Sequence, residues 1–301
     1  MGAGKYYLDY GPVQMSIAAF AHGRPLDGEI LQVERYVHDL LEELTACLDV
    51  AKRPLTAQDS VKKLPQILKS MNAAVMVSED TALTPMAAVA GAFADAVADF
   101  LVVKNASRVI VNNGGDIALR LAAGDSAVVG LQSDLDGRNF SHTFTVEGTS
   151  NCRGIATSGL GGRGFTKGIA SAVTVLAKSS RVADACATSI ANWTTVDDPA
   201  VLRLPAAVLE PQSDIKEQLV TVGCSSLEPQ AYLRALQGGM ARAGQLLQDG
   251  IILGAAIFAG TYMSVLPESF AAQIEAGIVG SVGKLESWLG KDETHIYPID
   301  L

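Results

Sequence analysis

The stretch 154–193 constrains the fold more than any other part of the chain, because it predicts a strand, a loop, a second strand and a helix in succession. The first strand leads into Thr157-Ser158-Gly159, and 172–177 is an apolar, β-branched run of strand length. Between the two strands, 159–168 is rich in glycine and offers little side-chain cover. An alanine-rich segment, 183–191, then favours a helix. The stretch therefore predicts a loop with an exposed backbone, 159–168, followed after one strand by a helix.

Two side chains on this expected helix are suited to hold a metal ion. Asp184 is expected at or near the first turn, and Thr188, four residues on, shares its face. A carboxylate beside a hydroxyl near a helix N-terminus suits a hard cation and the phosphates that it carries. Alternatively, Asp184 only caps the helix and Thr188 is packed or bonded to the preceding turn. The stretch alone leaves both interpretations open.

The composition limits the partners that the chain can have. At 301 residues, with 49% hydrophobic and 18% charged residues, it can bury a substantial core. A net charge of −9 argues against nucleic acid or an anionic membrane as the main partner, while a local basic pocket could hold a small anion. The start has no apolar segment of signal-peptide length, and the most apolar run, 250–266, falls short of a bilayer span. We therefore expect a cytoplasmic protein; a homo-oligomer is left open.

The four cysteines show neither zinc-site spacing nor a disulfide framework. Each is predicted to be a small buried hydrophobic residue in a reducing compartment. They are Cys47, Cys152, Cys186 and Cys224.

Hydrophobic periodicity predicts strands and helices in mixed order along the rest of the chain. Further strands are expected within 6–20 and at 73–77, 109–111, 127–132, 142–147, 219–224 and 251–265. Further helices are expected at 30–48, 61–70, 85–101 and 228–248. This pattern predicts an α+β fold, with largely antiparallel sheets and helices packed on them, in a single compact domain over 1–301.

A second candidate for ligand binding follows the expected strand at 109–111. Gly114 and Gly115 let the backbone turn sharply and come near a ligand, and Asp116 can accept hydrogen bonds from ligand hydroxyls or amides. The preceding Asn-Gly pair is also the commonest hairpin signal. A plain turn is therefore predicted equally well.

Four signals occur in a fixed order along the chain: an alanine- and glycine-rich helix start near Ala90, Gly-Gly-Asp-Ile at 114–117, Ala-Thr-Ser-Gly at 156–159 and Ala-Asp-Ala-Cys-Ala-Thr at 183–188. In order and rough spacing they resemble the FAD:protein FMN transferase (ApbE) superfamily. The resemblance is best over 74–195, and it implies an ApbE-like, T-fold-like domain.

The resemblance also implies a ligand set. Asp184, Thr188 and a backbone carbonyl near Ala90 would bind a Mg²⁺ that bridges the pyrophosphate of FAD. The residues that would approach the flavin or phosphates, or line the same cleft, are Thr157, Ser158, Gly159, Gly114, Gly115 and Asp116. The reaction implied is transfer of FMN from FAD to a protein threonine, with AMP as the leaving group.

The chain departs from the superfamily at two places. Where the transferases have a histidine followed by a Pro-Thr-Gly segment, this chain has the glycine-rich run 161–168, and Gly91 replaces the lysine of an Ala-Lys-Gly segment. The pattern looks more like the cytoplasmic branch of the superfamily, some members of which are linked to sulfur assimilation into homocysteine.

Two hypotheses follow. In the first, the protein is a Mg²⁺-dependent flavin transferase or pyrophosphatase, with Asp184 on the metal and Lys167 or Arg163 supplying the positive charge of the missing lysine. In the second, it is a non-transferase that binds another anionic ligand and acts in sulfur assimilation, with Cys152 or Cys186 near the cleft.

Overall fold

The computed structural model describes residues 4–56, 63–132, 141–225, 227–276 and 295–296. One large sheet organises this part of the chain, and each pairing within it is antiparallel. Its strand order is β1-β2-β4-β5-β8-β9-β12-β13, with β3 paired to β2. The bounds are β1 Lys5–Tyr10, β2 Val13–Ala21, β3 Arg24–Pro25, β4 Arg108–Asn113, β5 Asp116–Leu121, β8 Gly154–Ser158, β9 Ala172–Ala177, β12 Ile252–Ala259 and β13 Tyr262–Leu266.

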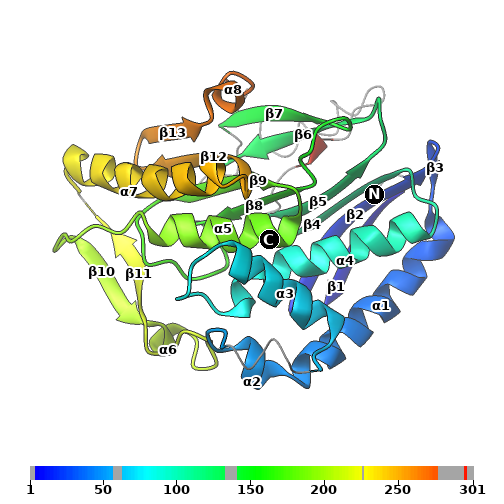
Figure 1. The fold of residues 1–301 in the computed structure, drawn as a ribbon, viewed down its shortest axis with the longest axis horizontal. Helices are drawn as coiled ribbons and strands as arrows, with labels where there is room; N and C mark the ends of the chain where they lie inside the picture. Colours follow the sequence, from blue (N-terminus) through cyan, green and yellow to red (C-terminus); the bar gives the residue numbers. More distant parts are fainter. Residues whose placement is uncertain (1–3, 57–62, 133–140, 226, 277–294, 297–301) are drawn as a thin grey trace.

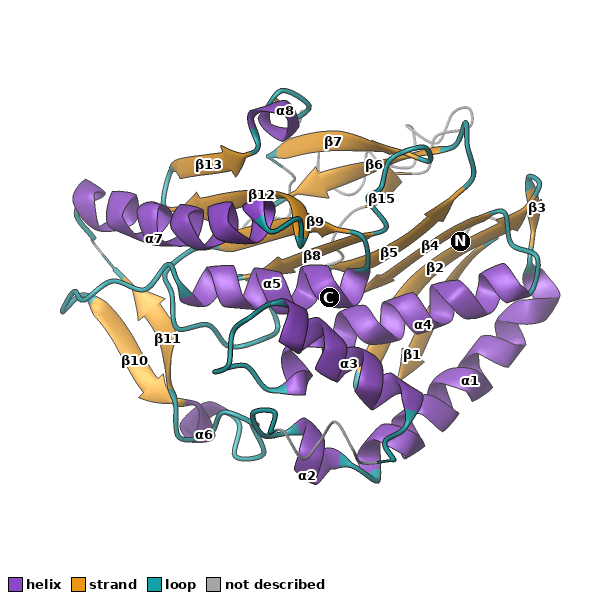
Figure 2. Ribbon diagram, viewed as in Figure 1, coloured by secondary structure: helices purple, strands orange, loops and turns teal. Residues whose placement is uncertain are grey.

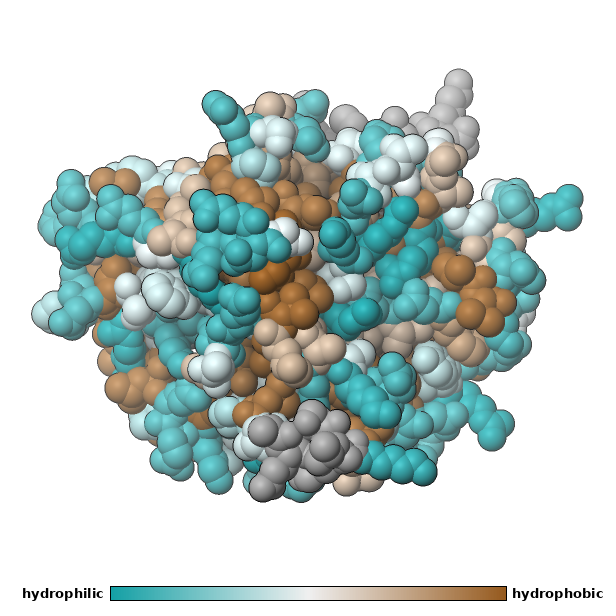
Figure 3. Space-filling model, in the orientation of Figure 1, coloured by the Kyte–Doolittle hydropathy of each residue, from teal (hydrophilic) through white to brown (hydrophobic). Residues whose placement is uncertain are grey.

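The longer helices gather on one face of this sheet (Figures 1 and 2). They are α1 Asp27–Thr45, α3 Gln66–Val77, α4 Val89–Val103, α5 Ser180–Asn192 and α7 Pro229–Gln248. Short helices accompany them: α2 Leu48–Ala51, the 3₁₀ turn η2 Pro85–Ala88, α6 Ala206–Leu209 and α8 Glu268–Ala271. Polar side chains cover much of the face seen in Figure 3, and apolar surface gathers near its centre.

Smaller sheets complete the fold. β6 Ser126–Leu131 and β7 His142–Glu147 pair with each other and with β15 His295–Ile296 and β14 Glu275–Ala276, while β10 Val201–Pro205 and β11 Leu219–Cys224 form a separate pair. Apolar side chains of β6 and β7 form a core with those of β4, β5 and β8, whereas α5 and α7 form another with β9 and β12. Strands covered on both faces need apolar residues throughout, and all six residues of β9 are buried.

These elements confirm the predicted α+β fold with largely antiparallel sheets. The helices expected at 30–48, 85–101 and 228–248 and the strands at 109–111, 127–132, 142–147 and 219–224 are present, with small shifts of their ends. The assignment of all 301 residues to one domain stays a prediction, because the segments 277–294 and 297–301 lie outside the described residues.

Two predicted strands are wrong. The segment 73–77 is the second half of α3, because Ile67, Leu68, Met71 and Val75 form a buried stripe at helical spacing that outweighs the local apolar run. The segment 251–265 is a hairpin, β12 and β13, because Gly260 takes a φ of +59° and reverses the chain. Of the helix expected at 61–70, residues 61–62 lie outside the described residues, 63–65 are not helical, and 66–70 are the start of α3.

The helical segment Pro85–Val103 is long and apolar enough by length and composition to cross a membrane. Half of it is buried inside the molecule. It packs against α5 and against β4 and β5, which is the position of a core helix.

Candidate functional site

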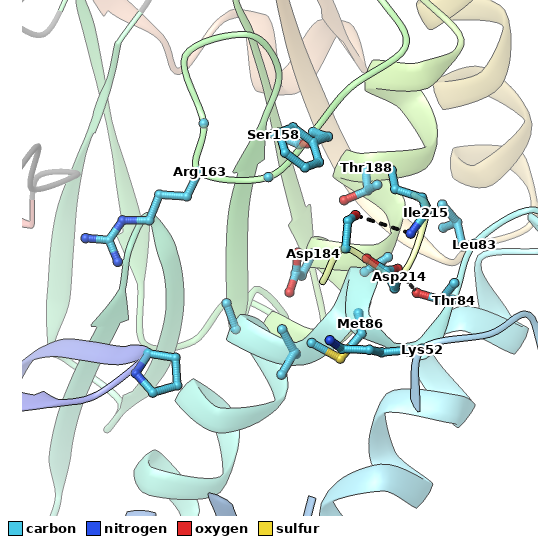
Figure 4. A pocket seen from close by; sticks show the side chains of 18 of the residues that line it. Lys52, Leu83, Thr84, Met86, Ser158, Arg163, Asp184, Thr188, Asp214 and Ile215 are labelled. Carbon is cyan, nitrogen blue, oxygen red and sulfur yellow. Dashed lines mark hydrogen bonds between the residues drawn. The ribbon is translucent and has the colours of Figure 1, made fainter. Parts of the chain in front are cut away.

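A cleft of about 660 Å³ lies between the helices and one end of the large sheet. Its walls come from α1, η2, α4 and α5, from the β4–β5 turn, from the end of β8 and its following loop, and from the segment 210–218 (Figure 4). Segments far apart in the sequence therefore meet around one space.

Asp184 lies at the polar end of this cleft, in the second turn of α5 rather than the first. Its Oδ2 accepts a hydrogen bond of 3.0 Å from the backbone N–H of Gly91 on α4. The two helices can approach so closely because Gly91 has no side chain: a Cβ there would lie 2.4 Å from the carbonyl oxygen of Ser180. Gly91 is thus a packing requirement of this chain.

Asp116 reaches the same end of the cleft from the β4–β5 hairpin. Gly114 and Gly115 form the turn with φ values of +67° and +106°, which glycine adopts at low cost. The side chain of Asn112 accepts the N–H of Gly115 at 2.8 Å and fixes the turn. The hairpin and the ligand-binding interpretations of this motif are therefore compatible.

The two carboxylates lie close enough to affect each other. Burial, and then the charge of Asp184, raises the pKa of Asp116 well above its ordinary value. Burial raises the pKa of Asp184 to about 7, against the opposing effect of hydrogen bonds from the N–H groups of Gly91 and Ala90. Oδ1 of Asp116 is buried without a hydrogen-bond partner. No described lysine or arginine forms an ion pair with either carboxylate.

Further oxygen atoms surround this pair. Thr188 lies one turn after Asp184 on α5, and both side chains line the cleft. The carbonyl of Ala90 accepts the Nδ2–H of Asn113 at 3.0 Å, which orients that carbonyl. Carboxylate, hydroxyl and carbonyl oxygens are the ligands of hard divalent cations, so these residues fit a Mg²⁺ ion.

Nine of the eleven residues predicted for the site line the cleft: Asp184, Lys167, Arg163, Gly114, Asp116, Thr157, Ser158, Thr188 and Ala90. The other two, Gly115 and Gly159, are buried in their turns and do not line it. Gly159 has a φ of +132°, and a Cβ there would lie 2.8 Å from the carbonyl oxygen of Ser171. These two glycines allow the turns that position the neighbouring lining residues.

The two predicted cationic residues differ in their surroundings. Arg163 donates to Oε1 of Gln14 at 2.7 Å and points away from Asp184 in Figure 4. The backbone of Lys167 is held on both sides, by Oδ1 of Asn192 at 2.9 Å and by the hydroxyl of Thr221 at 3.0 Å. Lys167 is therefore fixed at the wall of the cleft by its main chain, while its side chain makes no hydrogen bond to the described residues.

Several lining residues have no signal in the sequence. The hydroxyl of Thr84 donates to Asp214 (Figure 4). Nζ of Lys52 donates to the carbonyl oxygen of Gln212 at 2.6 Å. These contacts join the segment 210–218 to the opposite wall across 130 and 160 residues of sequence. Spacing along the chain cannot reveal such pairs.

Another part of the cleft is apolar. The walls there are apolar side chains of α1, of the start of α2 and of the helical segment from η2 into α4. They are Leu41, Leu44, Leu48, Met86, Val89 and Phe93. The cleft thus has a hard-oxygen end and an apolar end, which suits a ligand with a charged group and a planar ring.

Cys152 and Cys186 do not line the cleft. Both are buried, and burial raises the pKa of each thiol to about 12. Neither is a thiolate at neutral pH, as a reactive cysteine must be. Cys47 and Cys224 are only partly buried, so the prediction of burial is wrong for these two.

Comparisons with known proteins agree with this architecture. A family model described as AbpE bacteria matches residues 1–270. A UPF0280 protein of Methanopyrus kandleri is 37% identical over 211 residues, which are 65% of this chain and 82% of that protein. A UPF0280 protein of Methanococcus vannielii is 41% identical over 133 residues, 43% of this chain, and the match spans about half (51%) of that relative.

A solved structure gives the likeness in three dimensions. The apo form of the flavinyl transferase ApbE of Pseudomonas stutzeri has a TM-score of 0.50, covering 92% of this chain and 98% of that chain, at 13% sequence identity. At such low identity the likeness shows the fold alone.

Proposed function

The chain belongs to the bacterial AbpE family, and we propose that it binds a flavin dinucleotide, or another nucleotide diphosphate, together with Mg²⁺ in the cleft. One observation carries the proposal: Asp116 and Asp184 share the polar end of the cleft, and no described lysine or arginine forms an ion pair with either. Two buried carboxylates without a counter-charge are costly. A bound divalent cation would remove that cost.

The residues divide the work of binding. Asp184, Asp116, Thr188 and the carbonyl of Ala90 would hold the cation, which when bound neutralises a pyrophosphate and stabilises a leaving nucleoside monophosphate. The apolar end would take a planar ring and exclude water from it. The end of β8, at Thr157 and Ser158, would lie against the phosphates or the ring.

Lys167 replaces the missing lysine of the relatives in this proposal. A lysine at position 91 would collide with the backbone of Ser180, so the positive charge has to come from another wall. Lys167 lines the cleft with its backbone fixed, whereas Arg163 is held by Gln14.

The reaction proposed is cleavage of the pyrophosphate of FAD with release of AMP. In transfer, a bond forms between FMN phosphorus and a threonine oxygen; in hydrolysis, the oxygen comes from water. In both, the phosphorus–oxygen bond to AMP breaks. Release of AMP therefore tests either outcome.

The sulfur-assimilation alternative has no comparable support. The two cysteines that it requires near the cleft are buried outside it as protonated thiols, and the comparisons name no sulfur chemistry. We do not propose it.

The test begins with protein stripped of metal by EDTA. Mn²⁺ binding is measured by electron paramagnetic resonance, FAD binding by fluorescence, and AMP by chromatography after Mg²⁺ is added. We expect Asp184→Ala to abolish Mn²⁺ binding and AMP release. The control, Asp197→Ala, removes an exposed carboxylate outside the cleft and should change neither. A protein that binds neither Mn²⁺ nor FAD would overturn the proposal.

A further inference from the structure

Asp95, on α4, accepts four hydrogen bonds although only 1% of it is exposed. Its Oδ1 accepts the backbone N–H of Ser180 at 3.2 Å and Nη2 of Arg120 at 3.1 Å. Its Oδ2 accepts the backbone N–H and Nη1 of Arg181 at 3.1 and 3.0 Å. This carboxylate is thus fully occupied by the start of α5 and by β5.

The contacts of Asp95 fix where α5 begins. Ser179, at the N-cap position of α5, makes no side-chain capping bond, so Asp95 satisfies the first N–H groups from the neighbouring helix instead. Four residues earlier on α4, Gly91 donates to Asp184. One face of α4 therefore holds the first two turns of α5, and with them Asp184.

Arg181 is the cation best placed to interfere with the site. It lies three residues before Asp184 on α5, so the two side chains are neighbours on the helix surface. Its guanidinium is directed to Asp95, and its side chain is 34% exposed and has room to move. Arg120 has a second partner, Asp99, at 2.7 Å and is held in place.

We infer that Asp95 is a positioning residue that holds the guanidinium of Arg181 away from Asp184, and so leaves the Asp184 carboxylate open for a cation. The inference rests on the proposed function, because it concerns the same cation. Without Asp95, Arg181 pairs with Asp184 and competes with the metal. Asp95 touches neither metal nor nucleotide in this scheme.

The test compares Mn²⁺ affinities of the full chain by electron paramagnetic resonance, with thermal melting as a measure of folding. We expect Asp95→Asn to weaken Mn²⁺ binding about 10- to 100-fold, as loss of a neighbour of a metal ligand does. The double variant Asp95→Asn/Arg181→Gln should bind within about threefold of the unchanged protein. A role limited to capping α5 gives no such recovery, because the double variant still lacks the carboxylate.

Asp99→Asn is the matched control. It removes a carboxylate from the same helix and a partner of the same Arg120, but it does not touch Arg181, so Mn²⁺ affinity should not change. If Asp95→Asn alone does not fold, the double variant still tests the inference, because it removes both the carboxylate of Asp95 and the positive charge of Arg181. A folded double variant that binds Mn²⁺ weakly contradicts the inference.

The outcomes separate the two proposals. Unchanged affinity in a folded Asp95→Asn variant would overturn this inference and leave the proposed function standing. Absence of Mn²⁺ binding by the unchanged protein would overturn the proposed function, and this inference with it.

Discussion

Asp95 and Asp184 are carboxylates on two helices that touch, and their surroundings are opposite. Asp95 is saturated by two guanidinium groups and two backbone N–H groups. Asp184 accepts backbone N–H groups and has Asp116 beside it in place of a cation. Asp95 thus joins α4 to the start of α5, whereas the carboxylate of Asp184 remains available to a ligand. Burial alone does not separate a structural carboxylate from a functional one; the balance of its partners does.

The largest effect should come from a change that disturbs both carboxylates at once. Gly91→Lys adds a Cβ that would lie 2.4 Å from the backbone carbonyl oxygen of Ser180. We expect α4 and α5 to separate, at a cost of about 3 kcal/mol in the free energy of unfolding, with loss of cation binding. Urea denaturation and Mn²⁺ titration measure the two effects.

Gly244→Lys is the control for that change. Gly244 lies in α7, and a Cβ there meets no atom within 4 Å. Because lysine favours a helix more than glycine does, this variant should gain up to about 1 kcal/mol. A stable Gly91→Lys protein that still binds Mn²⁺ would show that α4 and α5 do not need this close contact.

Two smaller losses of stability test the comparison between Asp95 and Asp184 directly. In EDTA, Asp95→Ala should cost about 2 kcal/mol, because it leaves two backbone N–H groups and two partly buried guanidinium groups without their acceptor. Asp184→Ala should cost about 1 kcal/mol or less, because it removes a carboxylate that burial already disfavours. Denaturation with urea gives both numbers. Equal losses in the free energy of unfolding would mean that Asp95 and Asp184 have equivalent structural roles.

The smallest effect is a dependence on pH. The pKa of Asp184 is about 7 in the folded chain and near 3.8 in the unfolded chain, so the folded chain holds a proton that the unfolded chain has released. Without metal, stability should therefore fall as the pH rises from about 4 to about 7. Melting temperatures in EDTA should fall over this range, and Asp184→Asn should reduce the slope.

Magnesium should reverse that trend, since the cation competes with the proton for the same carboxylate. The rise in melting temperature on adding Mg²⁺ should be larger at pH 8 than at pH 5.5. An equal rise at both values would place the cation elsewhere.

Much of the fold follows from local patterns, and the site follows from them only in part. Thr188 was placed beside Asp184 because spacing along one helix depends on α-helical geometry alone. The segment 73–77 is wrongly predicted as a strand because its five apolar residues in a row fit a buried helix as well as a strand. Its helical stripe becomes clear only together with the residues before it.

Contacts between distant segments could not be predicted in the same way. The contact of Asp95 with the start of α5 depends on how α4 packs against α5. In the sequence, Asp95 lies in an alanine-rich helix, where nothing distinguishes it from an exposed aspartate. The bond between Thr84 and Asp214 spans 130 residues. No periodicity connects such positions, so the wall formed by the segment 210–218 emerged only from the structure.

The proposed cation site would be assembled from α4, the β4–β5 turn and α5, each contributing one or two oxygen atoms. In the large sheet, β2 pairs with β4, β5 pairs with β8 and β9 pairs with β12, so long stretches of chain must close before these pieces meet. Pairings between distant segments form slowly during folding. A chain that is only partly folded would therefore have the individual ligand residues but no assembled site, so under the proposed function a cation would bind at the end of folding rather than at its beginning.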